Sequence, residues 1–283
     1  YSFITGVIFI LFNFSGIRLF NSLNLAMTVS SAGAFLPTNS LSDIIKLPSQ
    51  EIILSLSLIF STLNIYFFYS LFSNFNNIKK HYEDVVILSS LFLFSLILFF
   101  SIGQISFLVI FLNVVSSVSN SGISSFNPPE NFFLFFVFLT ILGGSLLSNS
   151  NGIKFIRIYI LFKSTILELF KLVTPNIVMD QKILNTQHKI NNDNLNSSFL
   201  IFICFFISIF ILSSVLAAGG LNFENSFKLS ILTITNTVNS SLYGIDEINF
   251  LNLLTSSKIT IILFMVLGKI ELLSLFLIIK KAI

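Results

Sequence analysis

The residues best suited to binding an ion lie in three short polar turns that interrupt apolar segments. The turns are Ser30-Ser31-Ala32-Gly33-Ala34, Ser119-Asn120-Ser121-Gly122-Ile123 and Asn236-Thr237-Val238-Asn239-Ser240. A dehydrated cation crossing a bilayer needs substitute ligands, and rings of backbone carbonyls provide them. A half-length apolar segment precedes each turn, and the negative end of its helix dipole would favour a cation.

A turn presents its carbonyls to an ion when its residues tolerate left-handed backbone, Gly first and Asn second. Gly33, Gly122 and Asn239 hold that position, at spacings of 89 and 117 residues. One such turn alone fits a helix connection with a C-cap glycine, whereas three in matched positions favour a shared task. The predicted cation filter comprises Ala32, Gly33, Ser121, Gly122, Val238 and Asn239.

Another polar segment, residues 143–157, begins inside an apolar run and leaves through two cations, Lys154 and Arg157. Irregular backbone in a membrane is tolerated only where it packs against protein or lines a water-filled path. The segment is therefore a candidate gate. Lys269 lies deep in the last apolar run, where a charge must face water or a partner. The predicted gate comprises Gly143, Gly144, Ser145, Ser148, Asn149, Ser150, Gly152 and Lys269.

The composition indicates an integral membrane protein. Of 283 residues, 54% are hydrophobic and 10% are charged, whereas soluble domains carry about 25% charged residues. The apolar runs long enough to span a bilayer are 52–72, 85–101, 131–147, 198–218 and 259–279, with 1–14 as the end of another. Three shorter segments fit half-helices, namely 17–31, 104–120 and 225–238. The single cysteine, Cys204, excludes a disulfide framework and a cysteine-based metal cluster.

Basic residues set the predicted orientation, because Lys and Arg concentrate on the cytoplasmic side. That side carries Lys79, Lys80, Lys154, Arg157, Lys163, Lys171, Lys182, Lys189, Lys280 and Lys281. The opposite side holds the turns and the acids Asp43, Glu51, Glu130, Glu224, Asp246 and Glu247. Lys154 and Arg157 are either positive-inside anchors or links from a cytosolic partner to the gate. The outer acids either gather cations or are ordinary surface residues, and His81 is expected to be an ordinary loop histidine.

The order and spacing of these segments resemble the Trk/Ktr/HKT superfamily of cation transporters, in particular TrkH-like potassium uptake proteins. The resemblance lies in GGSLLSNSNGIKFIRIYILFK at residues 143–163, followed by LELFKLVTPN at 167–176. Val266-Leu267-Gly268-Lys269-Ile270-Glu271-Leu272-Leu273 resembles the family's Gly-Arg-Leu-Glu segment. Residues 23–41 and 113–126 resemble the filter regions of the family's second and third repeats.

The resemblance implies an all-α membrane protein with pseudo-fourfold repeats of span, pore half-helix, filter turn and span, the first repeat being missing. The start at Tyr1 rather than Met agrees with an incomplete beginning. The implied divisions are 1–73, the second pore repeat with its first span truncated; 74–84, a cytoplasmic loop; 85–174, the third pore repeat with the gating loop 143–152; 175–197, a polar cytoplasmic connection; and 198–283, the fourth pore repeat.

The resemblance also implies an activity: uptake of potassium or another monovalent cation, with K+ as the transported ion at the filter carbonyls and the intramembrane loop as the gate. Such a protein is not an enzyme, and neither a cofactor nor nucleic acid is expected. The expected surroundings are the lipid bilayer of a bacterial inner membrane. The expected partners are a second copy of the chain, making a homodimer, and a cytosolic nucleotide-binding regulatory subunit of the RCK type, similar to TrkA.

The sequence departs from the family at several points. Asn239 stands where the family has glycine, Lys269 stands where it has arginine, and Leu146, Leu147, Ser150 and Asn151 replace glycines or small residues of the loop. An arginine forms planar bidentate pairs that a lysine cannot. These departures leave open a non-conducting scaffold. A respiratory-complex membrane subunit is a further alternative, but it needs ionisable residues in several spans, and four of the predicted spans have none.

Overall fold

The computed structural model describes residues 2–33, 35–38, 41–73, 81–103, 105–174, 182, 184, 190–237, 240–245, 248, 250 and 253–270. In this part the chain is helical apart from turns, loops and one parallel β-bridge between Leu142 and Ile153. The α-helices are α1 (Ser2–Phe14), α2 (Leu19–Ser30), α3 (Pro48–Thr62), α4 (Ile65–Ser73), α5 (Tyr82–Ile102), α6 (Phe107–Val118), α7 (Phe133–Ile141), α8 (Phe155–Val173), α9 (Asn192–Ala218), α10 (Phe223–Ile234) and α11 (Thr255–Ile270). Short 3-10 helices are η1 (Leu41–Asp43), η3 (Glu130–Phe132) and η4 (Ser241–Tyr243).

The three predicted half-helices are confirmed as α2, α6 and α10, each 12 residues long. At 1.5 Å per residue such a helix is about 18 Å long, too short to cross a hydrocarbon core of about 30 Å. Polar residues follow each helix, because the apolar run ends at the turn.

Two helices in the described part, α5 and α9, are long and apolar enough to cross a membrane. Glu83 and Asp84 occupy the first turn of α5, where the helix dipole favours negative charge. Gly103 ends α5 in the left-handed conformation at φ 67°. Large apolar side chains such as Phe100 and Phe210 remain 80% and 75% exposed, as expected for surfaces that face lipid rather than water.

Two predicted spans are interrupted. The run 52–72 forms α3 and α4 with a break at Leu63 and Asn64, because Asn64 begins α4 by accepting a hydrogen bond from the Tyr66 N–H (3.0 Å). The run 131–147 is helical only to Ile141, since the bridge and the glycines that follow bend the backbone. The predicted span 259–279 is helical as part of α11 to Ile270, and 271–283 lie outside the described residues.

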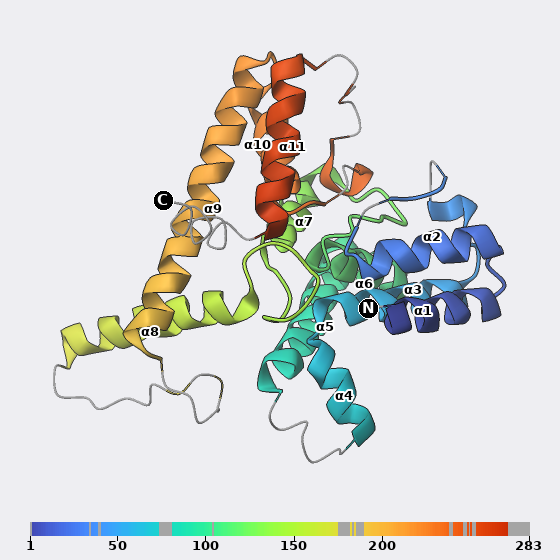
Figure 1. Cartoon of the computed structure of the whole chain (residues 1–283), viewed down its shortest axis with the longest axis horizontal. Coiled ribbons are helices and arrows are strands. Elements are labelled where there is room, and N and C mark those ends of the chain that lie inside the picture. The colour runs from blue at the N-terminus through green and yellow to red at the C-terminus, as the bar shows by residue number, and fades with distance from the viewer. Residues whose placement is uncertain are drawn as a thin grey trace.

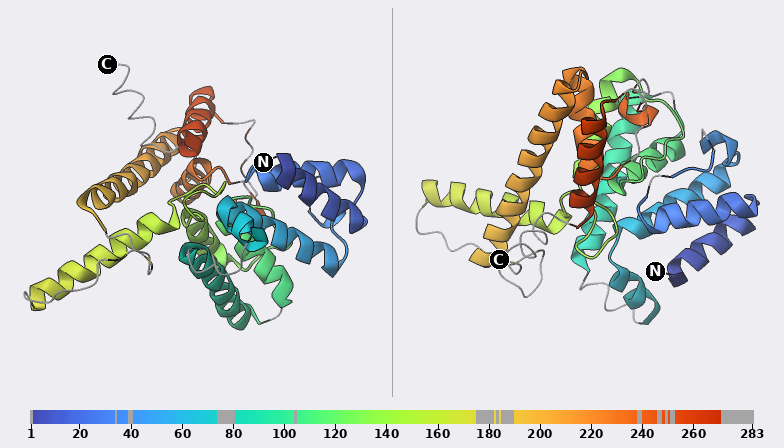
Figure 2. Two further views of the ribbon diagram at one scale, coloured as in Figure 1. Left: turned by 60° about the horizontal axis from the view of Figure 1, so that its bottom comes forward. Right: turned by 45° about the horizontal axis from the view of Figure 1, so that its top comes forward.

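The bundle is arranged around α6. Its residues Ile110, Leu112, Val114 and Val115 are fully buried, and it contacts α3, α5 and α7. Figure 1 shows α1, α2 and α3 on one side and α9, α10 and α11 on the other, with α5, α6 and α7 between them. Both views in Figure 2 show α8 projecting away from the other helices.

A close helix contact gives a first prediction. A Cβ atom on Gly268 of α11 would collide with the backbone carbonyl of Ile234 at the end of α10. Gly268→Ala should therefore lower the thermal unfolding midpoint, since overpacking typically costs about 1–3 kcal/mol. Gly6 of α1 has open space around its Cβ position and is the matched control. Gly6→Ala should keep or raise the midpoint, because Ala favours a helix by about 1 kcal/mol over Gly. Circular dichroism at 222 nm on the detergent-solubilised protein measures both, and equal midpoints would contradict the prediction.

Candidate cation filter and gate

The three turns end their half-helices with the same backbone hydrogen bonds. In each, the third residue after the helix donates to the carbonyl five residues earlier, from Gly33 to Thr28 (2.9 Å), from Ser121 to Ser116 (3.1 Å) and from Thr237 to Leu232 (2.9 Å). The residue before it is left-handed in every case, with φ of 45° at Ala32, 62° at Asn120 and 53° at Asn236. The described part of each turn therefore has the same backbone geometry.

The geometry corrects the sequence alignment of the turns. Gly33 is the counterpart of Ser121, one residue before Gly122, and of Thr237, two residues before Asn239. The left-handed residue after α2 is Ala32 rather than Gly33, at the same position as Asn120 and Asn236 in the other two turns. Gly122 is left-handed as expected, at φ 65°. Val238 and Asn239 lie outside the described residues.

The two left-handed asparagines hold their turns to the helix that follows. Asn120 donates its side-chain amide to the Thr140 carbonyl on α7 (2.7 Å), and Asn236 donates to the Met265 carbonyl on α11 (2.9 Å). Thr140 and Met265 each stand three residues before a glycine, Gly143 and Gly268. The sequence analysis assigned no role to either asparagine, although both follow a half-helix at the same distance.

Hydrogen bonds link the α6 turn to the α10 turn, and the α2 turn to α11. Asn120 also reaches the Thr237 hydroxyl (3.4 Å), which joins the α6 turn to the α10 turn. The α2 turn meets α11 through Lys269, whose Nζ donates to the Ser31 carbonyl (3.0 Å). Because Met265 and Lys269 are one helical turn apart on α11, the α2 and α10 turns contact neighbouring parts of the same helix. The α6 and α10 turns are thus in direct contact, and the α2 turn contacts the helix that follows the α10 turn.

The predicted gate residues 143–152 form a compact loop that docks on the end of α3. The N–H groups of Ser145 and Asn149 donate to the Thr62 carbonyl (2.9 Å) and the Ser61 carbonyl (3.1 Å). The Asn149 side chain donates to the Ser30 carbonyl at the end of α2 (2.5 Å). Cβ atoms on the loop glycines would meet backbone, at Gly143 the Asn151 carbonyl (2.6 Å) and at Gly152 the Ile141 carbonyl (2.8 Å). The loop therefore packs against protein, as its place inside an apolar run requires.

Lys154 is buried and donates several hydrogen bonds to residues of the loop. Its side chain is 6% exposed, and Nζ donates to the Ser150 carbonyl (2.7 Å), the Ser148 carbonyl (2.9 Å) and the Ser148 hydroxyl (3.2 Å). The Ser150 hydroxyl in turn accepts the Gly144 N–H (2.7 Å). Lys154 is thus hydrogen-bonded to the loop itself and is buried rather than solvated. Arg157 is half-buried in the first turn of α8.

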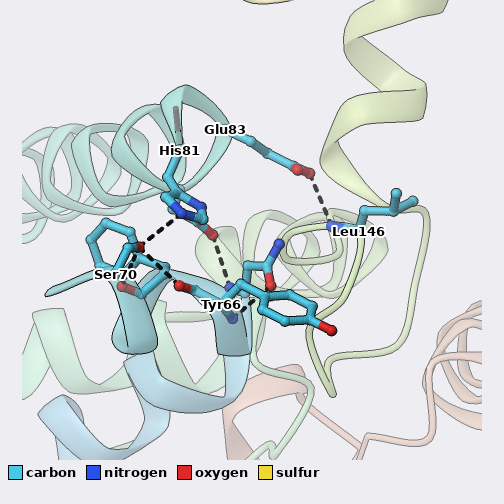
Figure 3. A network of polar contacts seen from close by, with 8 residues as sticks. Tyr66, Ser70, His81, Glu83 and Leu146 are labelled. Carbon is cyan, nitrogen blue, oxygen red and sulfur yellow. Dashed lines mark hydrogen bonds and ion pairs between the residues drawn. The ribbon is translucent and has the colours of Figure 1, made fainter. Parts of the chain in front are cut away.

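The loop is also attached to the start of α5 by groups that the sequence analysis did not select. Glu83 Oε1 accepts the Leu146 N–H (3.0 Å), and Asp84 Oδ1 accepts the Asn64 N–H (2.9 Å). His81 pairs with Asp84 (3.6 Å) and with the Ser70 hydroxyl (2.8 Å). Figure 3 shows His81 facing Ser70, and Glu83 reaching Leu146. His81 is therefore part of a polar network, not an ordinary loop histidine, and only the tertiary fold reveals it.

Two of the predicted outer acids meet at a cavity of about 400 Å³ beside α10. Glu130, Glu224 and Lys228 line it. Lys228 is 3% exposed, pairs with Glu224 (2.6 Å) and lies over the Phe133 ring (5.3 Å). Asp246 and Glu247 lie outside the described residues.

The described helices and the docked loop place the chain in an all-helical fold class. Within that class it is similar to the crystal structure of the potassium transporter TrkH from Vibrio parahaemolyticus, with a TM-score of 0.85 and 19% identity over 97% of the chain. The chain spans 61% of the length of that protein. At this identity the likeness establishes the fold, and it confirms the TrkH-like resemblance at that level.

Comparisons at the level of sequence give no match. No protein-family profile matches the chain, and no curated protein does.

The contacts of Lys154 give a second prediction. Lys154→Met keeps the length of the side chain but removes three hydrogen bonds, and bonds to charged groups are worth about 1.5–3 kcal/mol each. Hydrogen exchange at the Ser145 and Asn149 amides should accelerate by roughly ten-fold or more, measured by mass spectrometry. Lys171→Met is the control on the same helix, since Lys171 is exposed and pairs with Glu168 (2.6 Å) away from the loop. Unchanged loop exchange in Lys154→Met would contradict this role.

Proposed function

We propose that the chain is the larger part of a TrkH-like transporter that moves potassium, or another monovalent cation, across a membrane. One observation supports this above all others: three half-helices of equal length end in the same turn, the α6 and α10 turns contact each other, and the α2 turn contacts α11, the helix after the α10 turn. A cation passing these turns would meet backbone carbonyls in place of its hydration water. No covalent chemistry is needed, so no residue acts as a catalyst.

The helix dipoles support the choice of a cation. A helix carries the equivalent of about half a negative charge at its C-terminus, and α2, α6 and α10 all direct their C-termini to the turns. The residues around the α6 turn are polar and buried, with Ser116, Ser119 and Ser121 at 0% exposure. Such surroundings supply oxygen atoms without a full charge, which suits a weakly held ion that must leave again.

We assign the filter to the backbone carbonyls near Ala32, Gly33, Ser121 and Gly122, with Val238 and Asn239 as the proposed fourth-repeat members. We assign the gate to the loop 143–152 together with Lys269. We assign Lys269 to the gate because its Nζ donates to the Ser31 carbonyl, next to the Ser30 carbonyl that Asn149 of the loop contacts. A positive charge at that place would oppose the passage of a cation.

The fold similarity also supports a larger assembly. We infer that each of the three units, 1–73, 85–174 and 198–283, is one pore repeat, and that a fourth unit completes the ring. A homodimer in a bacterial inner membrane, with a nucleotide-binding TrkA-like subunit on its cytosolic face, follows from the same inference. The polar segments 74–84 and 175–197 would lie on that face.

Uptake of rubidium tests the proposed function directly. The full-length protein, expressed in a bacterial host that lacks its own potassium uptake systems, should restore growth at low potassium and accumulate rubidium. Membrane expression without rescue and without rubidium uptake would refute the transporter and favour the non-conducting scaffold.

Removal of the charge at Lys269 gives a third prediction. Lys269→Ala should raise rubidium flux several-fold in proteoliposomes, because the positive charge next to the filter is lost. Lys258→Ala on the same helix, three helical turns away, is the matched control and should leave flux close to that of the parent protein. Equal flux in the Lys269→Ala and parent proteins would exclude a barrier at this residue.

The left-handed backbone at Gly122 gives a fourth prediction. An L-residue there is strained at φ 65°, and the strain amounts to about 1–2 kcal/mol. Gly122→Ala should reduce rubidium uptake by roughly ten-fold or more, because the carbonyls of the turn shift. Gly220→Ala is the matched control, with φ 93° and open space around it, at a turn away from the filter. An equal loss of uptake in both variants would point to misfolding and contradict a filter role for Gly122.

A further inference from the structure

The three turns are not held in the same way. Asn120 and Asn236 attach the α6 and α10 turns to α7 and α11 through side-chain hydrogen bonds of 2.7 and 2.9 Å. The corresponding residue after α2 is Ala32, which has no polar group. An alanine is also less suited than asparagine to left-handed backbone. The α2 turn therefore has the most strained residue and lacks the side-chain attachment that the other two turns have.

The Thr28 hydroxyl bridges the α2 turn by donating to the Phe35 carbonyl (2.7 Å), and the described hydrogen bonds that the turn accepts from other elements come from the gate. Asn149 of the loop donates to the Ser30 carbonyl (2.5 Å), and Lys269 donates to the Ser31 carbonyl (3.0 Å). These carbonyls belong to the last turn of a helix, where no intrahelical N–H remains to pair with them. Asn149 is itself fixed, because its own N–H donates to the Ser61 carbonyl (3.1 Å). One loop residue thus joins the end of α3 to the end of α2.

We propose that Asn149 is a positioning residue that couples the loop to the α2 filter turn, so that loop movement changes ion selectivity as well as flux. This inference rests on the proposed function. When the loop leaves its docked position, the Ser30 carbonyl loses its donor, and the α2 turn relaxes. The α6 and α10 turns keep their asparagine attachments and their geometry. Selectivity then falls because one of the filter turns no longer has a fixed position.

A second attachment of the loop, at Leu146, provides the comparison. There the Leu146 N–H is held by the Glu83 carboxylate (3.0 Å), in a contact that involves α5 and no filter turn. Breaking this contact loosens the loop at Leu146 only, while Asn149 keeps its bonds to the Ser30 and Ser61 carbonyls. Loss of the Asn149 contact should therefore change selectivity, whereas loss of the Glu83 contact should change flux alone.

The test compares variants of the full-length protein in proteoliposomes, with rubidium and sodium fluxes measured side by side. Asn149→Ala should lower the rubidium-to-sodium flux ratio at least three-fold. Glu83→Leu should raise both fluxes together and leave the ratio within two-fold of the parent protein. Asn151→Ala removes the same amide group two residues further on, where the side-chain nitrogen is buried and has no hydrogen-bond partner in the described part of the chain. It should also leave the ratio within two-fold.

A second measurement does not depend on transport. Hydrogen exchange at the Gly33 amide, which is bonded to Thr28, should accelerate in Asn149→Ala, whereas exchange at the equivalent Ser121 and Thr237 amides should not. A changed flux with an unchanged ratio and unchanged Gly33 exchange would overturn the coupling and leave the proposed function intact. No flux of either ion through the parent protein would refute the proposed function, and the coupling with it.

Discussion

The structure depends on one constraint: a helix that ends inside an apolar layer leaves its last carbonyls without partners, and no water is at hand to satisfy them. Three half-helices end in this way. Their turns reuse some of these carbonyls, as when the Gly33 N–H donates to Thr28. The remaining ones at Ser30 and Ser31 accept hydrogen bonds from Asn149 and Lys269. The need to satisfy the end of α2 is therefore what brings the loop and the last helix to the same place.

The half-helices and the break at Gly143 could be predicted from the sequence because both depend on local composition. An apolar run of about twelve residues that stops at small polar residues can do little else in a membrane. The break at Asn64 could not be predicted in the same way. Besides the local bond between the Asn64 side chain and the Tyr66 N–H, it involves the Asp84 carboxylate, which accepts the Asn64 N–H from 20 residues away. The alignment error in the turns arose because glycine was taken as the left-handed residue although Ala32 holds that place.

Lys154 illustrates why long charged side chains resist prediction. Its position near the end of an apolar run fits a cytoplasmic anchor, and the positive-inside rule assigns it to the cytoplasmic side. The flexible side chain can also fold back, and here Nζ donates to the Ser148 and Ser150 carbonyls of the loop. These carbonyls are available because the backbone of the loop is irregular. The sequence therefore shows the cation, but its hydrogen-bond partners are known only once the loop conformation is known.

The loop has fewer glycines than its family resemblance implies, and the structure explains which ones are retained. Gly143 and Gly152 stand where a Cβ atom would strike backbone carbonyls, so the bridge between Leu142 and Ile153 requires them. Leu146 and Leu147 are 46% and 50% exposed, on the outward side where a side chain meets no such limit. The two leucines therefore leave the docking contacts of the loop intact. A loop built in this way would move by releasing its few attachments, rather than by bending throughout its length.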